Sequence, residues 1–448
     1  MADDRKIDSE SLKSLLDAGD ADKAGKTLLE EHPADIARFL GELGDEHLKS
    51  LFYVLDPKLA SEVVAELNDE ARDVILEDME SKRVGEIVDH MASDDAADLL
   101  GALSDEDARK VLDHLPADDS HQVKSLLAFE DDTAGGLMQM EIASVRSDAS
   151  VQSVIDMLRA NREDTEDIHN IFVVDANEQL TGVLPIRRLV LEPLETIISD
   201  IMDEDIISVH VDEDQEEVAK IFKKYDLLSL PVIDDFDRVV GRVTVDDIVD
   251  VMEEEASEDF FKMAGAGSDD ILPKSILKSA KIRLPWLFAS CLGGLVALKI
   301  IGAFEDTLGQ MVVLVSFIPV ILGMGGNIGT QSTTIVVRGL ATGALEVGSL
   351  WRVVFKEIRI GVILGIVYGL FLGAAAYLIY PENAFLSLVV GLAMWTSMVL
   401  AAAVGTLMPI VLFRSGVDPA VATGPFVTTS VDIMGILILF GFATFFLL

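Results

Sequence analysis

Apolar residues recur at helical intervals among acidic positions between residues 34 and 133, as in ADIARFLGEL, KLASEVVAEL and EDARKVLDHL. An acidic or capping residue lies at or near the start of each of these segments, and a short break follows each one. Such spacing is typical of short helices that stack in antiparallel order. The pattern therefore predicts an all-α domain of helical repeats in the first part of the chain.

An internal repeat follows between residues 139 and 260. SVRSDASVQSVIDML and IFVVDANEQLTGVLPIRRLV parallel SVHVDEDQEEVAKIF and LPVIDDFDRVVGRVTVDDIV. Asp175 and Gly182 match Asp234 and Gly241 at the same internal spacing. Each copy predicts a strand, a helix, a strand, a turn with glycine, a strand and a helix, which is an α/β unit.

From residue 284 to the end, long apolar stretches dominate the sequence. They occupy 285–304, 311–337, 357–380, 384–412 and 421–448. Each is near or above the roughly 20 residues that a helix needs to cross a bilayer. The sequence therefore predicts an α-helical membrane domain with five spans.

Charge divides the chain at about residue 272. The chain has 77 acidic and 35 basic residues and a net charge of −42, and only seven acids and ten bases lie from residue 273 onward, so all of the net negative charge lies in the earlier part. This acidity excludes nucleic acid as a partner, because phosphates need Lys and Arg. It fits either bound cations or a solvated acidic surface. The single Cys291 cannot form an internal disulfide and is expected to be a packing residue.

Basic residues also predict the orientation of the spans. Arg338, Arg352, Lys356 and Arg359 cluster around the connection between the second and third stretches, and Arg414 falls between the fourth and fifth. The other two connections hold Glu305, Asp306 and Glu382. Because Lys and Arg collect on cytoplasmic loops, we expect the N-terminal half in the cytosol and the C-terminus outside. The opening MADDRKIDSESLKSLL has no apolar core, so no signal peptide is expected.

Asp432 is the least expected residue of the membrane part, since it stands within the apolar segment VTTSVDIMGILILF. A carboxylate in mid-span costs about 2.5–3.5 kcal/mol or more on insertion scales. It is tolerated where it faces water or a cation, or as a protonated structural residue. Gly424, Pro425 and Thr428 precede it and predict a loosened helix start whose carbonyls could add oxygen ligands.

The second apolar stretch, SFIPVILGMGGNIGTQSTTIVVRGLATG, combines four glycines with a row of polar side chains. GMGGNIG lacks the Gly-Lys-Ser/Thr ending of a phosphate-binding loop and lies in an apolar run, so we exclude that function. Asn327, Gln331 and their polar neighbours either join helices or line a pathway, and the length of the row favours a pathway.

A third concentration of charge lies where the repeat meets the membrane part, in VDDIVDVMEEEASEDFFKMAG. Acids at this density surround most of a helix, whose neighbouring domains are themselves acidic. The acids are Asp246, Asp247, Asp250, Glu253, Glu254, Glu255, Glu258 and Asp259. A solvated face is the plain interpretation, and cations that bridge the carboxylates are the alternative.

These motifs together resemble the MgtE family of magnesium channels. The resemblance extends over nearly the whole chain, through HPADIA and SDDAADLL, AGGLM at 134–138, the repeat, RLPWL at 283–287, PVILGMGGNIGTQ at 319–331, RGLATG at 338–343 and DPAVATGPFVTTSVDIMG at 418–435. It implies a helical N domain at 1–133, CBS domains at 134–200 and 201–256, an acidic connecting helix at 243–272 and a pore domain at 273–448.

The resemblance also implies functions for particular residues. It implies a homodimer around one pore, in which Asp432 recognises Mg²⁺ with the Thr428 backbone and Asn327 as further contacts. Octahedral Mg²⁺ loses water reluctantly, so two symmetry-related carboxylates suit a hydrated ion. The repeat resembles a CBS pair, a module that dimerises and often binds adenine nucleotides; Arg187, Arg188 and Asp246 are candidate phosphate and ribose contacts.

We further hypothesise that internal Mg²⁺ closes the pore. The candidate regulatory ligands are Asp247, Asp250, Glu255, Glu258 and Asp259, with Asp94, Asp95 and the run from Asp212 to Glu217, including Glu216, on the opposite wall. Two other functions remain open. A coupled carrier for Mg²⁺, Co²⁺ or Mn²⁺ would use the same residues, and a membrane-anchored CBS sensor would need neither Asp432 nor the polar second stretch. No nucleophile, base and orienting group occur together, so an enzyme is not expected.

Overall fold

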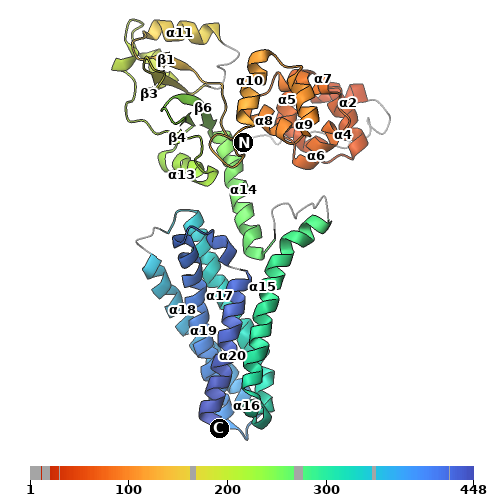
Figure 1. The fold of residues 1–448 in the computed structure, drawn as a ribbon, viewed down its shortest axis with the longest axis vertical. Helices are drawn as coiled ribbons and strands as arrows, with labels where there is room; N and C mark the ends of the chain where they lie inside the picture. Colours follow the sequence, from red (N-terminus) through yellow and green to blue (C-terminus); the bar gives the residue numbers. More distant parts are fainter. Residues whose placement is uncertain are drawn as a thin grey trace. The chain divides into compact units, whose positions relative to one another are not determined.

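A computed structural model of the chain describes Leu12 and residues 21–29, 31–161, 168–266, 276–345, 350–422 and 424–447. It divides into an N-terminal unit, Met1–Val251, and a C-terminal unit, Met252–Leu448. Figure 1 shows the elements of both units in chain order. The boundary falls inside helix α14 (Val245–Ala264), within the predicted connecting helix. Residues 267–275, where that prediction ends, lie outside the described residues.

The N-terminal unit opens with short stacked helices, as the apolar spacing predicts. Their first turns are capped locally, for example by Asp56, Asn68 and Ser104, whose side chains accept hydrogen bonds from backbone N–H groups. The helices are α2 (Ala21–Leu28), α3 (Pro33–Gly41), α4 (Asp45–Phe52), α5 (Pro57–Ala65), α6 (Asp69–Leu76), α7 (Ser81–Val88), α8 (Ser93–Gly101), α9 (Asp105–Leu112) and α10 (Ala117–Leu126).

The repeat folds into two equivalent α/β halves. Their elements are β1 (Ser144–Arg146), α11 (Val151–Ala160), β2 (Asn170–Val174), β3 (Leu180–Pro185) and α12 (Ile186–Leu191), then β4 (Val209–His210), α13 (Gln215–Tyr225), β5 (Ser229–Ile233), β6 (Val239–Thr244) and α14, with the short 3₁₀ helix η2 (Ile198–Asp200) between the halves. In each half the first two strands are parallel and the last two antiparallel. The predicted order of strands and helices is confirmed.

The repeated Asp and Gly hold equivalent places in the two halves. Asp175 and Asp234 each accept two backbone N–H bonds that close the turn between antiparallel strands. The prediction that glycine forms this turn is wrong, because Gly182 and Gly241 lie within β3 and β6. A Cβ at Gly182 would lie 2.5 Å from Met202 Sδ, so glycine is needed for close approach of a neighbouring segment.

One core cluster joins the helical repeats to the second half of the repeat, whereas the first half has a core of its own. The joint cluster extends from Leu40 and Leu100 through Met138 to Phe222 and Val251. The separate cluster includes Val151, Ile171 and Leu184. Helices α8 and α14 therefore belong to one packed body, which places their acidic first turns near each other.

The C-terminal unit has five helices long and apolar enough to cross a membrane, as the sequence predicts. Its elements are α15 (Ile276–Ala303), α16 (Glu305–Gln310), η4 (Val312–Phe317), α17 (Ile318–Ala341), α18 (Leu350–Ile379), α19 (Ala384–Arg414), η6 (Pro419–Ala422) and α20 (Pro425–Leu447). Helix α19 packs against α17, α18 and α20, which run alongside it (Figure 1).

The membrane helices begin and end differently from the apolar stretches that predict them. The third span begins at Leu350 instead of residue 357, and Arg338 lies in the last turn of α17. Arg352, Lys356 and Arg359 are therefore helical residues and not parts of a loop. The helices continue beyond the purely apolar segments because the backbone hydrogen bonds do not require apolar side chains.

Close packing of the membrane helices depends on glycines in contact with backbone. A Cβ on Gly405 of α19 would clash with the carbonyl oxygen of Gly329 on α17, and one on Gly369 of α18 would lie 2.7 Å from the Gly391 carbonyl. Neighbouring backbones can be this close only without side chains between them.

We expect Gly405→Ala to lower the thermal unfolding temperature of the purified protein in detergent, because the clash is with backbone and overpacking costs about 1–3 kcal/mol. Gly294→Ala is the matched control, since a Cβ there meets no atom within 4 Å. Equal unfolding temperatures for the two variants would contradict this packing.

Candidate functional site

Helix α17 divides its polar side chains between two faces. Ser332 and Thr333 are buried: Ser332 donates to Glu357 Oε2 of α18 at 3.1 Å, and Thr333 donates to the Gly405 carbonyl of α19 at 2.7 Å. These two residues join helices. The other polar residues recur at helical spacing on an exposed face, which we call the α17 polar face: Asn327, Thr330, Gln331 and Thr334.

Asp432 lies in the second turn of α20, within the span Pro419–Phe446. Its side chain is half-buried. Thr428 lies one turn earlier on the same face, and its hydroxyl donates to the Gly424 carbonyl at 3.2 Å. The helix is continuous from Pro425, so the prediction of a loosened start applies at most to Gly424 and the residues before it.

Glycines of α17 set the rotation of α20. A Cβ at Gly325 would lie 3.0 Å from Val431 Cγ1, and one at Gly329 would lie 3.3 Å from Val427 Cγ1. The residues that follow these two valines are Thr428 and Asp432. The valine contacts therefore fix the direction in which Asp432 leaves the helix. Within the described part of the chain, no hydrogen bond joins Asp432 to Asn327.

Lys262 connects α14 to the segment that leads into α20. Its Nζ lies 2.6 Å from Glu258 Oε1 and 2.9 Å from Asp418 Oδ2. Partial burial alone would lower the pKa of Lys262, but its bonds to Glu258 and Asp418 outweigh burial and raise it. Asp418 also accepts a hydrogen bond from the Ala420 N–H at 2.7 Å, so it caps η6.

A group of carboxyls in the N-terminal unit is held close together by the shared core. Asp94 is 6% exposed in the first turn of α8, and its Oδ1 accepts a bond from the Asp95 N–H. Asp247, in the first turn of α14, accepts from the Thr244 hydroxyl at 2.5 Å. We call Asp94, Asp95 and Asp247, with the exposed Asp246 and Asp250, the α8–α14 acids.

The pKa values of the buried members are high. Burial raises the pKa of Asp94 well above its ordinary value, and the charge of Asp247 adds to the effect. Burial and the same charge raise the pKa of Asp95 to about 7. Burial also raises the pKa of Asp247, to about 6, against the lowering effect of its bond from Thr244. Asp94, Asp95 and, to a smaller extent, Asp247 therefore keep their protons to a higher pH than ordinary carboxyls, and a cation could replace those protons.

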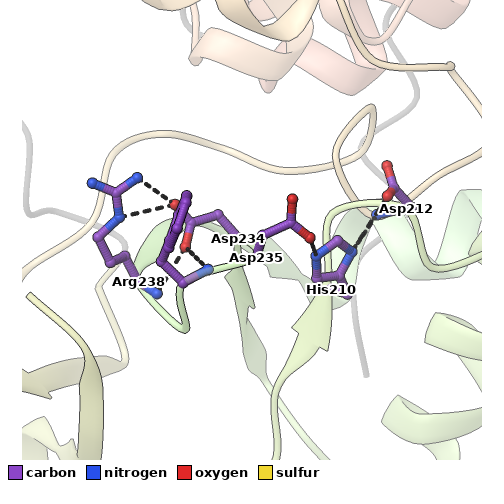
Figure 2. Close-up of polar contacts among 6 residues, drawn as sticks. His210, Asp212, Asp234, Asp235 and Arg238 are labelled. Atoms are coloured by element: carbon purple, nitrogen blue, oxygen red, sulfur yellow. Dashed lines mark hydrogen bonds and ion pairs between the residues drawn. The ribbon is translucent and has the colours of Figure 1, made fainter.

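The run from Asp212 to Glu217 has local partners. Figure 2 shows His210 between two carboxylates, with Nδ1 3.5 Å from Asp212 and Nε2 3.2 Å from Asp235. Asp214 caps α13 by accepting the Glu216 N–H bond, and Glu216 lies 3.1 Å from Lys220. A metal ion at Asp212 or Glu216 would therefore compete with His210 or Lys220.

The candidate nucleotide contacts differ in accessibility. Arg187 and Asp246 are exposed on α12 and α14. Arg188 is already engaged, since it donates to the Ile201 carbonyl at 2.5 Å and to Asp203 at 2.9 Å. A nucleotide that uses Arg188 would have to displace these bonds.

No preformed metal cage is present among the described residues, because no three His, Cys, Asp or Glu side chains converge on one point there. Glu255, Glu258 and Asp259 lie along the later turns of α14, in the C-terminal unit. Their predicted opposition to acids of the N-terminal unit stays a prediction. The sequence did not predict the contacts of Glu357 and Lys262. For Glu357 the available signal was an acid at the first residue of an apolar stretch, and for Lys262 it was an acid four residues before the lysine.

Protein-family models match three parts of the chain. A divalent cation transporter model, MgtE, matches residues 318–442, the MgtE intracellular N domain matches 31–132, and CBS domains match 134–195 and 198–254. The fold and these matches define a membrane transporter of divalent cations that carries an intracellular helical domain and a CBS pair.

Two of the individual relatives that match this chain are transporters of one divalent cation, magnesium. The magnesium transporter MgtE of Enterococcus faecalis is 37% identical over 324 residues, 72% of this chain and 71% of its own. That of Thermus thermophilus is 38% identical over 319 residues, 70% of each chain. This chain belongs to the MgtE family of magnesium transporters. The cytosolic domain of the Mg²⁺ channel MgtE in complex with ATP aligns with a TM-score of 0.52 at 36% identity, over 54% of this chain and 99% of its own.

The raised pKa values predict that stability depends on pH. Between about pH 4 and pH 7 the folded state binds more protons than the unfolded chain, so stability falls as pH rises over that range. We expect the full-length protein in detergent with EDTA to lose on the order of 2 kcal/mol between pH 5 and pH 8, since one pKa unit corresponds to about 1.4 kcal/mol. Asp95→Asn should reduce this loss, measured by hydrogen exchange of α8.

Asp107→Asn serves as the control in the same unit. A bond from Ser104 and then one from Lys110 lower the pKa of Asp107, so this carboxyl does not contribute to a loss above pH 5. An identical pH dependence for Asp95→Asn and Asp107→Asn would contradict the assignment of the effect to the α8–α14 acids.

Proposed function

We propose that this protein is a Mg²⁺-selective channel for uptake across the cytoplasmic membrane, with Asp432 as the ion-recognising residue. The half-buried Asp432 carboxyl within an apolar span carries this proposal. A charge at this depth needs water or a cation. Mg²⁺ keeps most of its water and is held through one or two carboxylates, so a conducting site needs no protein cage. The Thr428 carbonyl and Asn327 are the proposed additional contacts.

A homodimer is supported by the α17 polar face. In a single chain Asn327 and Gln331 are exposed on a membrane helix, where an amide without a partner costs roughly 2–7 kcal/mol. A second copy would enclose this face together with water. It would also supply a second Asp432, so that a hydrated ion meets two carboxylates.

The proposed orientation places the N-terminal unit in the cytosol and the C-terminus outside. It is supported by Arg338, Arg352 and Arg414 at one end of the membrane helices and by Glu305 and Glu382 at the other.

The proposed gate is closed by internal Mg²⁺ that binds to the acids of the cytosolic unit and of α14. The raised pKa values of Asp95 and Asp247 support this, because carboxyls held this close are stabilised when a divalent cation replaces their protons. Asp94 and Asp250 complete that group, Glu255, Glu258 and Asp259 are the proposed ligands farther along α14, and Glu216 is a proposed ligand on α13.

Several sites are needed for such a gate. One weak site at ten times its dissociation constant contributes about 1.4 kcal/mol. A gate that moves from mostly open to mostly closed needs about 5.5 kcal/mol, so about four sites are required. Distributed acids supply this better than one tight site.

An adenine nucleotide is a proposed ligand of the CBS pair, supported by similarity to the cytosolic domain of the Mg²⁺ channel MgtE in complex with ATP. Arg187 and Asp246 are the accessible contacts. A coupled Mg²⁺ carrier with the same ion site is the second candidate. Flux that follows the Mg²⁺ gradient alone, with no proton or sodium gradient, favours the channel.

Asp432→Ala should abolish Mg²⁺ entry into proteoliposomes that contain a Mg²⁺-sensitive dye, because the ion loses its charged ligand. Glu382→Gln, an exposed acid near the end of α18, should leave the flux unchanged. Equal flux in the Asp432→Ala variant and the parent would make Asp432 structural and direct the search to Asn327 and Gln331.

Glu258→Ala combined with Asp259→Ala should leave the protein conducting at high internal Mg²⁺, because two proposed ligands of the gate are removed. The control is Lys262→Met, which removes the ion pairs to Glu258 and Asp418 and retains the acids. Inhibition by internal Mg²⁺ that is unchanged in the double variant refutes this part of the gate.

A further inference from the structure

The first turns of α18 extend beyond the hydrocarbon region of a bilayer. Helix α18 has 30 residues, about 45 Å at 1.5 Å per residue, whereas the hydrocarbon core is about 30 Å thick. The uncharged segment 360–379 is long enough to fill that core by itself. Residues 350–359 therefore lie at the level of the lipid headgroups.

Three basic side chains form a narrow stripe on this part of α18. Arg352, Lys356 and Arg359 follow at i, i+4 and i+7, which places them within about 60° around the helix. All three are exposed. We call these residues the α18 basic stripe.

Glu357, the only acid among residues 350–359, points toward α17 and not toward the stripe. Glu357 is 2% exposed and accepts the Ser332 hydroxyl bond from α17. Its other oxygen is 3.9 Å from Lys356 Nζ, a longer contact than those of Lys262. The helix therefore presents positive charge outward while its carboxylate faces the protein.

Aromatic residues lie along one side of the stripe, and apolar residues continue it farther along the helix. Trp351 and Phe355 are 58% and 59% exposed beside the stripe, and aromatic residues favour the interface of a bilayer. Farther along the same side of α18 are the exposed Ile363, Val367 and Leu370. The surface thus changes from basic to apolar at the depth where a lipid changes from phosphate to acyl chain.

We propose that the α18 basic stripe is a binding site for an anionic phospholipid, with the phosphate at Arg352, Lys356 and Arg359 and an acyl chain along Ile363, Val367 and Leu370. Charge complementarity selects this occupant over a second copy packed stripe to stripe, which would bring like charges together. The site is independent of the proposed pore and gate, since it requires only that α18 crosses a membrane.

The expected selectivity is large enough to measure. Each basic side chain near an anionic surface favours binding about fivefold, so the stripe favours an anionic over a zwitterionic lipid on the order of 100-fold. The preference should decrease with added salt because the contacts are exposed.

Trp351 is a reporter beside the site. The full-length protein with Trp286→Phe and Trp395→Phe, which retains only this tryptophan, is reconstituted in phosphatidylcholine nanodiscs. Brominated phosphatidylglycerol or brominated phosphatidylcholine is then titrated in as the quencher. We expect phosphatidylglycerol to quench Trp351 at a mole fraction at least tenfold lower, and salt to reduce that ratio.

Arg352→Gln with Arg359→Gln should bring the ratio of the two lipids close to one. The matched control, Lys281→Gln with Arg414→Gln, removes two exposed basic residues of other helices and should keep it. Equal quenching by both lipids in the parent, or a ratio that persists in the first variant, overturns the proposal. Absence of quenching by either lipid also overturns it, because a second copy would then cover the stripe.

Discussion

The membrane part of this protein is organised by one constraint: a charge in a bilayer must face water, a partner or the headgroups. The acids and bases of α18 and α20 meet it in different ways. Glu357 is buried against Ser332, the basic residues of α18 lie where the helix leaves the hydrocarbon, and Asp432 is half-buried at the turn after Thr428. Asp432 is the one of these residues that we propose to be stabilised by an ion and its water, and the proposed ion site is placed there for this reason.

In the cytosolic unit, charged residues that could each face water are instead held close together. Its acids could have been dispersed in water, yet the core shared by the helical repeats and the second CBS half holds Asp94, Asp95 and Asp247 close together. Burial first, and then the charges of neighbouring acids, raise the pKa values of these carboxyls, and protons or divalent cations relieve both effects. Under the proposed gate, a divalent cation that binds these acids would change the stability of this unit, which is the property that a sensor of the transported ion requires.

Helix α14 contains charges of both kinds. It begins with members of the α8–α14 acids, and near its end Lys262 is bound to Asp418. Asp418 caps the short helix that leads into α20, so an ion pair joins the acidic helix to the helix that bears Asp432. Lys262 supplies the positive charge that pairs with Glu258 and Asp418 at this point.

The sequence by itself determined the helical repeats, the CBS halves, the five spans and the family, because these depend on the spacing of residues near one another in the chain. It also indicated Asp432 as the proposed ion site, because that residue is a charge in an apolar run. Only the tertiary structure decided which polar residues of α17 are buried, that Glu357 turns toward Ser332, and that Lys262 meets Asp418. Those outcomes depend on the rotation and close approach of helices far apart in the sequence, which glycine contacts such as Gly405 with Gly329 set. The local spacing of apolar residues does not predict these contacts between helices.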